Sequence, residues 1–353
     1  MEYCKGKTPQ SQIRTSGAQP LRLLNALNEI KGEERERKNT MKIIFFGSSQ
    51  FAVTSLQAVL KRHSVLAVFT QPDRKRGRSL LMGGTPVKTS AQDNNIPVFQ
   101  PDNVCNEETR ARLTQYKADV FVVVAFGQKL SKEVLRLPRR YCINVHSSLL
   151  PRWRGAAPVN WALINGDKTS GVSVIRMNEY MDCGDIMLSK TISIEDEDNA
   201  ITLADKLSRL GAKALDEILT HIANNTMQFT PQDEQRATIA RKLKKEDGLI
   251  NWRDPAECIH NKVRGLLPWP CAYTYYKKQF LKIIKTRVVD FDAVLPSKTA
   301  AGHVEGIEKN QGIIVKTGQG SILLEKLQIE GKRVMSAYDF VLGHHLKPGE
   351  RLG

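Results

Sequence analysis

The sequence predicts an α/β fold: a doubly wound, mostly parallel sheet followed by a smaller, strand-rich domain. Strand and helix patterns alternate from Met41 onward, which is typical of a parallel sheet with crossover helices. The continuous apolar run Val120–Ala125 suits a central strand buried on both faces. Beyond Arg264, short strands punctuated by glycine and proline indicate a small β-barrel. Ligands of doubly wound sheets bind at the carboxyl ends of the strands, so we expect a site there.

The elements of the first domain follow from apolar periodicity. Lys42–Phe46 is predicted to be the first strand, and Phe51–Leu60 has the spacing of a helix. A long helix near residues 200–225 carries a core-facing stripe of apolar residues at steps of three and four. Gly47 follows the first strand, but its Gly-Ser-Ser-Gln sequence lacks the spacing of a dinucleotide-binding loop. The other predicted strands are Val65–Phe69, Asp119–Phe126, Cys142–His146, Gly171–Met177 and Asp185–Lys190.

The chain is predicted to divide into four parts. Residues 1–40 are a polar extension that we expect to be disordered, since the first strand begins directly after Met41. Residues 41–225 form the sheet domain, residues 226–244 a linker without periodicity, and residues 245–353 the β-barrel domain. The barrel domain is expected to contain a helix at Glu257–Arg264. Its predicted strands are Tyr273–Tyr276, Phe280–Lys285, Gly302–Val304, Gly312–Lys316 and Ser321–Leu327.

The composition is that of a soluble globular protein with a strongly basic balance. The 353 residues are 41% hydrophobic, and no apolar run approaches the ~18 residues that a membrane helix needs. The formal net charge of +16 favours a polyanion such as nucleic acid over a membrane, because no basic amphipathic anchor is present. A merely solvated basic surface is the alternative. The six cysteines lack a Cys-x-x-Cys pair, which indicates free thiols in a reducing cytoplasm and no zinc site.

The most informative motif is a strand with two polar side chains on one face. Within Cys142–His146, alternation places Asn144 and His146 on the same side and apolar residues on the other. Asp182 lies in a predicted turn between two later strands. An amide donor, an imidazole and a carboxylate at neighbouring strand ends suit acyl transfer to an amine. Taken singly, the three residues have simpler explanations: a core histidine, a turn-forming asparagine and a surface aspartate.

The combination of these residues with the run that follows them supports a functional assignment. An Asn-x-His motif running into Ser148-Leu-Leu-Pro151, with an Asp 38 positions after Asn144, resembles the folate-dependent formyltransferases. The longer run Ser148–Pro158 resembles the members of that family that act on methionyl-tRNA. The resemblance extends from Met41 to the C-terminus. It implies a Rossmann-like formyltransferase domain followed by an oligonucleotide-binding-like (OB-like) barrel that binds tRNA.

The resemblance also implies the substrates and the residue roles. The formyl group of 10-formyltetrahydrofolate would move to the α-amine of initiator methionyl-tRNA, and no metal is required. Asn144 and a protonated His146 would donate hydrogen bonds to the formyl oxygen, while Asp182 would support the imidazolium and accept the amine proton. The folate site would be lined by Ser148, Leu149, Leu150 and Pro151. The tRNA would be contacted by Arg74, Lys75, Arg76, Arg78, Arg152 and Arg154. The enzyme is expected to be a cytoplasmic monomer without an obligate protein partner.

Two positions depart from the family pattern. The connection at residues 70–88 is a loop rich in basic residues, and in it Ser79 stands where a glycine is expected after Arg78. Ser147 stands where the family usually has glycine. Ser147 would be strained if its backbone had a positive φ. Two other functions would use the same features: formyl transfer to a sugar nucleotide or purine precursor, and RNA binding without catalysis. The arginine-rich loop and the run Pro151–Gly155 argue against the first, and the presence of all three polar residues argues against the second.

Overall fold

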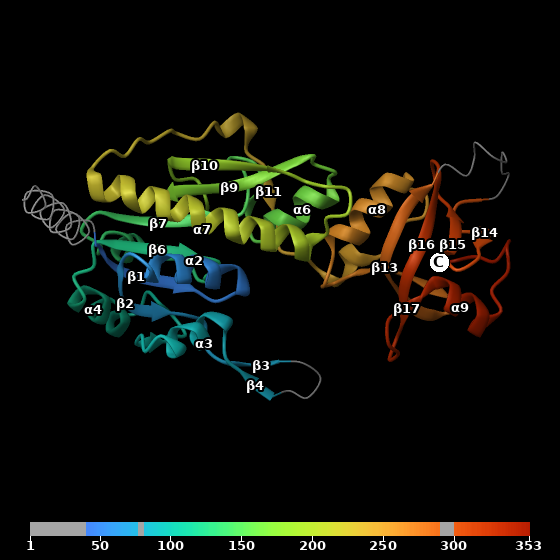
Figure 1. Ribbon diagram of the computed structural model, residues 1–353, viewed down its shortest axis with the longest axis horizontal. Coiled ribbons are helices and arrows are strands. Elements are labelled where there is room, and N and C mark those ends of the chain that lie inside the picture. Colours follow the sequence, from blue (N-terminus) through green and yellow to red (C-terminus); the bar gives the residue numbers. More distant parts are fainter. Residues whose placement is uncertain (1–39, 77–80, 290–299) are drawn as a thin grey trace, which may run out of the picture. The chain divides into compact units, whose positions relative to one another are not determined.

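The computed structural model describes residues 40–76, 81–289 and 300–353, and Met41–Gly353 forms one compact unit (Figure 1). Residues 1–39 of the predicted extension lie outside the described residues, as do Arg78 and Ser79. In the part of the chain that is described, no helix is long and apolar enough to cross a membrane.

Seven strands form the first sheet, in the order β10-β9-β7-β6-β1-β2-β5. The pairs β2–β5, β1–β2, β1–β6 and β6–β7 are parallel, whereas β9 runs antiparallel to both β7 and β10. The predicted mostly parallel α/β sheet is therefore confirmed. The strands are β1 (Lys42–Gly47), β2 (Ser64–Phe69), β5 (Val98–Phe99), β6 (Val120–Val124), β7 (Tyr141–His146), β9 (Thr169–Arg176) and β10 (Ile186–Ser193).

Both faces of this sheet are buried. On β1, Ile43 and Phe45 belong to one core while Ile44 and Phe46 belong to another, as the two-residue period of a strand requires. Helices α2 and α7 complete the first core, and α4 and α5 complete the second. The helices of this domain are α2 (Gln50–Leu60), α3 (Pro86–Asp93), α4 (Glu107–Gln115), α5 (Lys132–Leu135), α6 (Pro158–Ile164) and α7 (Ala200–Asn224).

Helix α7 is 25 residues long and packs its apolar stripe against the sheet, where Figure 1 shows it running beside β7 and β9. A capping box starts it: the Asn199 side chain accepts from the Thr202 N–H, and the Thr202 hydroxyl accepts from the Asn199 N–H. The helix comes closest to β7 at Gly211, where an added Cβ would lie 3.0 Å from Val145 Cγ1. Strand β7, which carries the predicted catalytic motif, is thus held between tightly packed layers.

The C-terminal domain has its own core and is rich in strands, as predicted, and these strands form an antiparallel sheet. Among the described residues the pairing order is β12-β13-β16-β15-β14, with β17 on the side of β16. Several elements differ from the prediction. Strand β13 continues past Lys285 to Val289, β14 begins only at Val304, β16 continues past Leu327 to Ile329, and β17 and α9 were not predicted. The elements are α8 (Ala256–Gly265), β12 (Ala272–Tyr276), β13 (Gln279–Val289), β14 (Val304–Glu308), β15 (Gly312–Lys316), β16 (Ser321–Ile329), β17 (Met335–Ser336) and α9 (Ala337–His344).

The ends of the predicted basic loop form a two-stranded ribbon. Strand β3 (Arg74–Arg76) pairs antiparallel with β4 (Leu81–Gly83), so that Arg74 lies opposite Gly83. The connection between β2 and α3 is therefore partly a hairpin, where the sequence had predicted an irregular loop. Thr85 follows the ribbon and caps α3 by accepting the N–H of Lys88.

Candidate functional site

The three predicted catalytic residues lie together at the carboxyl end of β7. Asn144 and His146 are both buried, and Asp182 comes from the turn between β9 and β10. Asn144 Nδ2 donates to Asp182 Oδ1 at 3.3 Å, and His146 Nδ1 lies 3.6 Å from Asp182 Oδ2. Asn144 and Asp182, which are 38 positions apart in the sequence, are thus joined by a hydrogen bond.

The backbone around Asp182 explains how the carboxylate reaches this position. The antiparallel register of β7 with β9 sets Arg176, the last residue of β9, opposite Ile143. The turn that follows β9 therefore begins near Ile143, and it brings Asp182 back to Asn144 and His146. Asp182 has φ +53°, a left-handed conformation that aspartate tolerates better than most residues. At Gly184 an added Cβ would lie only 1.7 Å from the Arg176 carbonyl oxygen. The turn therefore requires glycine at that position.

Both ring nitrogens of His146 face protein acceptors. Nε2 lies 2.9 Å from the carbonyl oxygen of Trp153, and because a carbonyl only accepts, this nitrogen carries the hydrogen. Nδ1 faces the carboxylate of Asp182. The geometry therefore directs His146 toward Trp153 and Asp182. A hydrogen bond from His146 to a formyl oxygen, the role that the resemblance implies, stays a prediction.

A segment that the sequence analysis had treated only as a linker contributes to the site. Gln232 Nε2 donates to the carbonyl oxygens of Asp182 and Gly184, both at 2.7 Å. Thr238 Oγ1 accepts the N–H of Trp153 at 2.9 Å. Strand β11 (Ile239–Ala240) pairs in parallel with β8 (Arg154–Gly155). No motif in the sequence indicated these contacts, because they join residues far apart in the chain, mostly through backbone groups.

Two of the four residues in the predicted folate run Ser148–Pro151 are buried and make hydrogen bonds within the protein. Ser148 is buried and donates its hydroxyl to the carbonyl of Arg152, and the N–H of Leu150, also buried, donates to Ser173 Oγ. Leu149 and Pro151 keep part of their surface exposed. Ser147 lies in the described part of the chain and does not have a positive φ, so serine causes no strain there.

The predicted tRNA-contacting residues have different environments. Arg74 is exposed, with one guanidinium N–H directed to Gln71 Oε1. Arg152 is 51% exposed and pairs with Asp167 at 2.7 Å. The expectation for Arg154 needs correction: it is 5% exposed, and its guanidinium binds Gln232 and Glu234, so burial keeps it from reaching a phosphate backbone. Arg78 lies outside the described residues, and Lys75 and Arg76 lie on β3.

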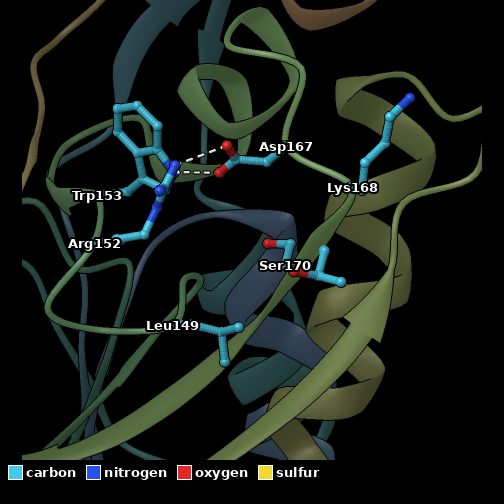
Figure 2. A pocket seen from close by; sticks show the side chains of 7 residues that line it. Leu149, Arg152, Trp153, Asp167, Lys168 and Ser170 are labelled. Atoms are coloured by element: carbon cyan, nitrogen blue, oxygen red, sulfur yellow. Dashed lines mark hydrogen bonds and ion pairs between the residues drawn. The ribbon is translucent and has the colours of Figure 1, made fainter.

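A pocket of about 170 Å³ lies beside the predicted folate run (Figure 2). In Figure 2 the side chains of Arg152 and Trp153 lie on the same side of the Asp167 carboxylate and both point toward it; the Trp153 indole N–H donates to it at 2.7 Å. The lining residues are Leu149, Arg152, Trp153, Asp167, Lys168, Thr169 and Ser170. Asn144, His146 and Asp182 do not line this pocket, so it is separate from the catalytic cluster.

Two other chemistries have no support at this site. Among the described residues, no group of three or more His, Cys, Asp or Glu side chains is arranged to hold a metal ion. Cys183 adjoins Asp182, but burial raises the pKa of its thiol, and its Sγ–H donates to the carbonyl of Met181. A protonated thiol is a poor nucleophile, so the raised pKa argues against Cys183 as an attacking group.

Comparisons with known proteins show the family of the chain. The chain matches the formyl transferase family over residues 41–219 and the formyl transferase C-terminal domain over residues 242–345. The methionyl-tRNA formyltransferase of Geobacter metallireducens is 43% identical over 314 residues, which cover 89% of this chain and 99% of that protein.

Two solved structures share the fold at low sequence identity. An N-formyltransferase from Helicobacter canadensis, in complex with folinic acid and dTDP-3-aminofucose, is 19% identical with a TM-score of 0.60, covering 81% of this chain and 99% of that one. HypX from Aquifex aeolicus, in complex with tetrahydrofolic acid, is 16% identical with a TM-score of 0.58, covering 87% of this chain. The match spans about half of HypX, 48% of its length.

Proposed function

The chain belongs to the methionyl-tRNA formyltransferases, and we propose that it moves the formyl group of 10-formyltetrahydrofolate to the α-amine of methionine esterified to initiator tRNA. The observation that carries the proposal is the Asn144, His146 and Asp182 cluster at the carboxyl end of β7. The folate ligands of the two structures with this fold support the choice of donor.

Asn144 stabilises the charge that develops on the formyl oxygen. When the amine attacks the formyl carbon, negative charge moves to that oxygen. The charge returns to the carbonyl as the bond between the formyl carbon and N10 breaks, and tetrahydrofolate leaves with a proton on N10. Asn144 Nδ2 carries two hydrogens. One of them is hydrogen-bonded to Asp182 Oδ1, and the second is free to bind the formyl oxygen of the substrate. A donor aimed at a developing oxyanion contributes ~3 kcal/mol, or ~10²–10³ in rate.

Asp182 accepts the proton that the attacking amine loses, directly or through water. Its carboxylate is partly buried beside His146 and accepts a hydrogen bond from the N–H of Gly155 at 2.9 Å, so it is oriented before the substrate arrives. His146 supports this carboxylate through Nδ1, while its Nε2–H is fixed on the Trp153 carbonyl. Leu149 and Pro151, whose surfaces are only partly covered, line the folate site.

The tRNA contacts are made by the basic hairpin and by the C-terminal domain. Arg74 is exposed at the base of the hairpin, and Lys75, Arg76 and Arg78 continue the basic run. Residues 251–353 carry 16 Lys/Arg against 10 Asp/Glu, a balance that suits phosphate contacts. Arg152 stays in this set because half of its side chain is exposed. For Arg154 we propose a different role, argued below.

The alternatives weighed from the sequence have less support. The structure solved with a sugar nucleotide is 19% identical to this chain, against 43% for the methionyl-tRNA enzyme over nearly its full length. A protein that only bound RNA would have no use for a partly buried carboxylate held against an imidazole and an amide.

The test is formyl transfer to methionyl-tRNA by two single variants. Asp182→Asn removes the proton acceptor, and His146→Ala removes the partner of its carboxylate, so each should lower kcat by roughly 10²-fold. Asp205→Asn, an exposed carboxylate on α7, is the matched control and should keep the parent kcat. Near-parent turnover in Asp182→Asn and His146→Ala would contradict the mechanism.

A further inference from the structure

We propose that Gln232 is a positioning residue for the formyl transfer: held by Arg154, it fixes the turn that carries Asp182. The inference rests on the proposed role of Asp182 and adds to it two residues from outside the Asn-x-His motif. Gln232 lies 50 residues after Asp182, in the segment between the two domains.

The Gln232 amide fastens the turn at two points. Its Nε2 donates to the carbonyl oxygens of Asp182 and Gly184, each at 2.7 Å. A side-chain amide has two N–H groups, so both are used on this turn. The two carbonyls flank Cys183, and the backbone on either side of it is therefore tied to a single planar group.

Arg154 fixes the orientation of that amide. Gln232 Oε1 accepts from Arg154 Nε at 3.0 Å and from Nη2 at 2.8 Å, so the opposite side of the amide is also satisfied. Glu234 accepts two further hydrogen bonds from the same guanidinium, both at 2.8 Å. A buried guanidinium is stable only when it is paired in this way, which explains why a charged side chain occupies this interior position.

The same stretch of chain orients the catalytic carboxylate itself. Gly155 N–H donates to Asp182 Oδ2, and the Trp153 carbonyl accepts from His146. Arg154 stands between these residues, and its own N–H donates to the carbonyl of Thr238. Gln232 thus holds the backbone of Asp182 while the neighbours of Arg154 hold its carboxylate and its imidazole partner.

The turn needs this support because its other side is open. Tyr180 and Met181, which precede Asp182, are 68% and 69% exposed, so little apolar packing restrains the chain there. Proton transfer requires a donor–acceptor separation of ~2.6–3.2 Å. A misplacement of ~1 Å can cost up to ~10²-fold in rate. The hydrogen bonds of Gln232 therefore limit the motion of the group on which the reaction depends.

The experiment compares the same substitution at two glutamines of one segment. Gln232→Met keeps the size of the side chain and removes its hydrogen bonds, and Gln235→Met is the matched control at an exposed position. We expect Gln232→Met to lower kcat roughly tenfold, while KM for 10-formyltetrahydrofolate stays within about twofold. Gln232→Glu keeps the acceptors for Arg154 but loses both donors, and it should lower kcat in the same way. Parent kcat in both Gln232 variants would overturn the proposal.

A double-mutant cycle separates positioning of Asp182 from a general structural effect. In an Asp182→Asn background, Gln232→Met should cause no further loss of kcat, since the group it positions is already removed. Losses that multiply would overturn the proposal, because Gln232 would then act on something else. Parent kcat in Asp182→Asn alone would instead refute the proposed function. A low kcat in Asp182→Asn with parent kcat in both Gln232 variants would refute only this inference.

Discussion

Asp182 divides its two carboxylate oxygens between different partners. Oδ1 accepts from the Asn144 amide, and Oδ2 accepts from the Gly155 N–H while facing the His146 ring. Together these contacts fix the direction in which the remaining lone pairs of the carboxylate point. The chemistry of the site therefore depends on the position of one residue within a turn.

The substitution Gly184→Ala, which adds one methyl group to the turn, tests how strongly the reaction depends on the position of Asp182. In Gly184→Ala the added Cβ would fall 1.7 Å from the Arg176 carbonyl oxygen, and a backbone atom cannot yield as a flexible side chain can. The turn must shift, so we expect kcat to fall by roughly 10²-fold and stability to fall by about 1–3 kcal/mol. Steady-state kinetics and thermal unfolding measure the two effects. The control is Gly343→Ala, where the added Cβ meets no atom within 4 Å. Unchanged kinetics in Gly184→Ala would mean that the turn tolerates displacement.

At the scale of elements, the start of α7 joins the two cores. Arg264 of α8 donates to the carbonyl oxygens of Glu195 and Asp198, directly before the helix. The Asp198 carboxylate accepts from Lys206, from Thr202 and from the Glu195 N–H. Burial raises the pKa of Asp198, but these hydrogen bonds outweigh it and leave the pKa below its usual value of 3.8.

This pKa shift predicts how stability depends on pH. Because folding lowers the pKa of Asp198, its stabilisation is complete above the unfolded value of about 3.8 and is lost as the pH falls through the folded value. At pH 7, Asp198→Asn should lower the free energy of unfolding by about 2 kcal/mol, the scale of hydrogen bonds to a charged group. Denaturant unfolding from pH 7 down to pH 3 should show the deficit shrinking at the acid end. A deficit that is constant with pH would contradict this account.

The spacing of apolar residues in the sequence predicted the long helices, but it did not predict the short ones. The predicted helix at Phe51–Leu60 is α2, and the one near residues 200–225 is α7, because both bury a stripe over several turns. Helices α3 to α6 have four to nine residues, too few for a clear period, and were not predicted. Strand β13 was predicted to end at Lys285, where register shifts break its alternation, although pairing with β16 continues to Val289.

At the site, too, the residues of a local sequence pattern were predicted, and the contacts between distant segments were not. Asn144 and His146 were predicted from a five-residue strand, since alternation alone puts them on one face. Gln232 was not predicted, because its hydrogen bonds go to backbone carbonyls and leave no sequence pattern. Arg154 was taken for a phosphate contact because nothing in the sequence shows whether an arginine is buried. Residue type predicts chemistry, but only packing decides what a side chain reaches.

At the scale of the whole molecule, the net charge of +16 predicts how tRNA binding depends on salt. Each phosphate contact releases counterions, so log affinity should fall linearly with log salt concentration, with a slope of roughly −0.7 to −0.9 per contact. Arg74→Ala should make this slope shallower by about one contact. Arg209→Ala, an exposed arginine on α7, is the control and should leave the slope unchanged. Filter binding across a salt series measures both, and salt-independent affinity would contradict the inference from charge.

The segment between the two cores also sets where this protein can be recombined. Gln232 binds the turn that carries Asp182, and Thr238 binds Trp153, yet both lie beyond the last helix of the sheet domain, which ends at Asn224. A chimera joined at residue 225 would take these side chains from the other parent, whereas a joint after Lys242 would keep them with Asp182. A catalytic domain transferred to another protein must therefore include this segment, although the segment contributes no strand to the seven-stranded sheet. Exchange of C-terminal domains between relatives is constrained accordingly.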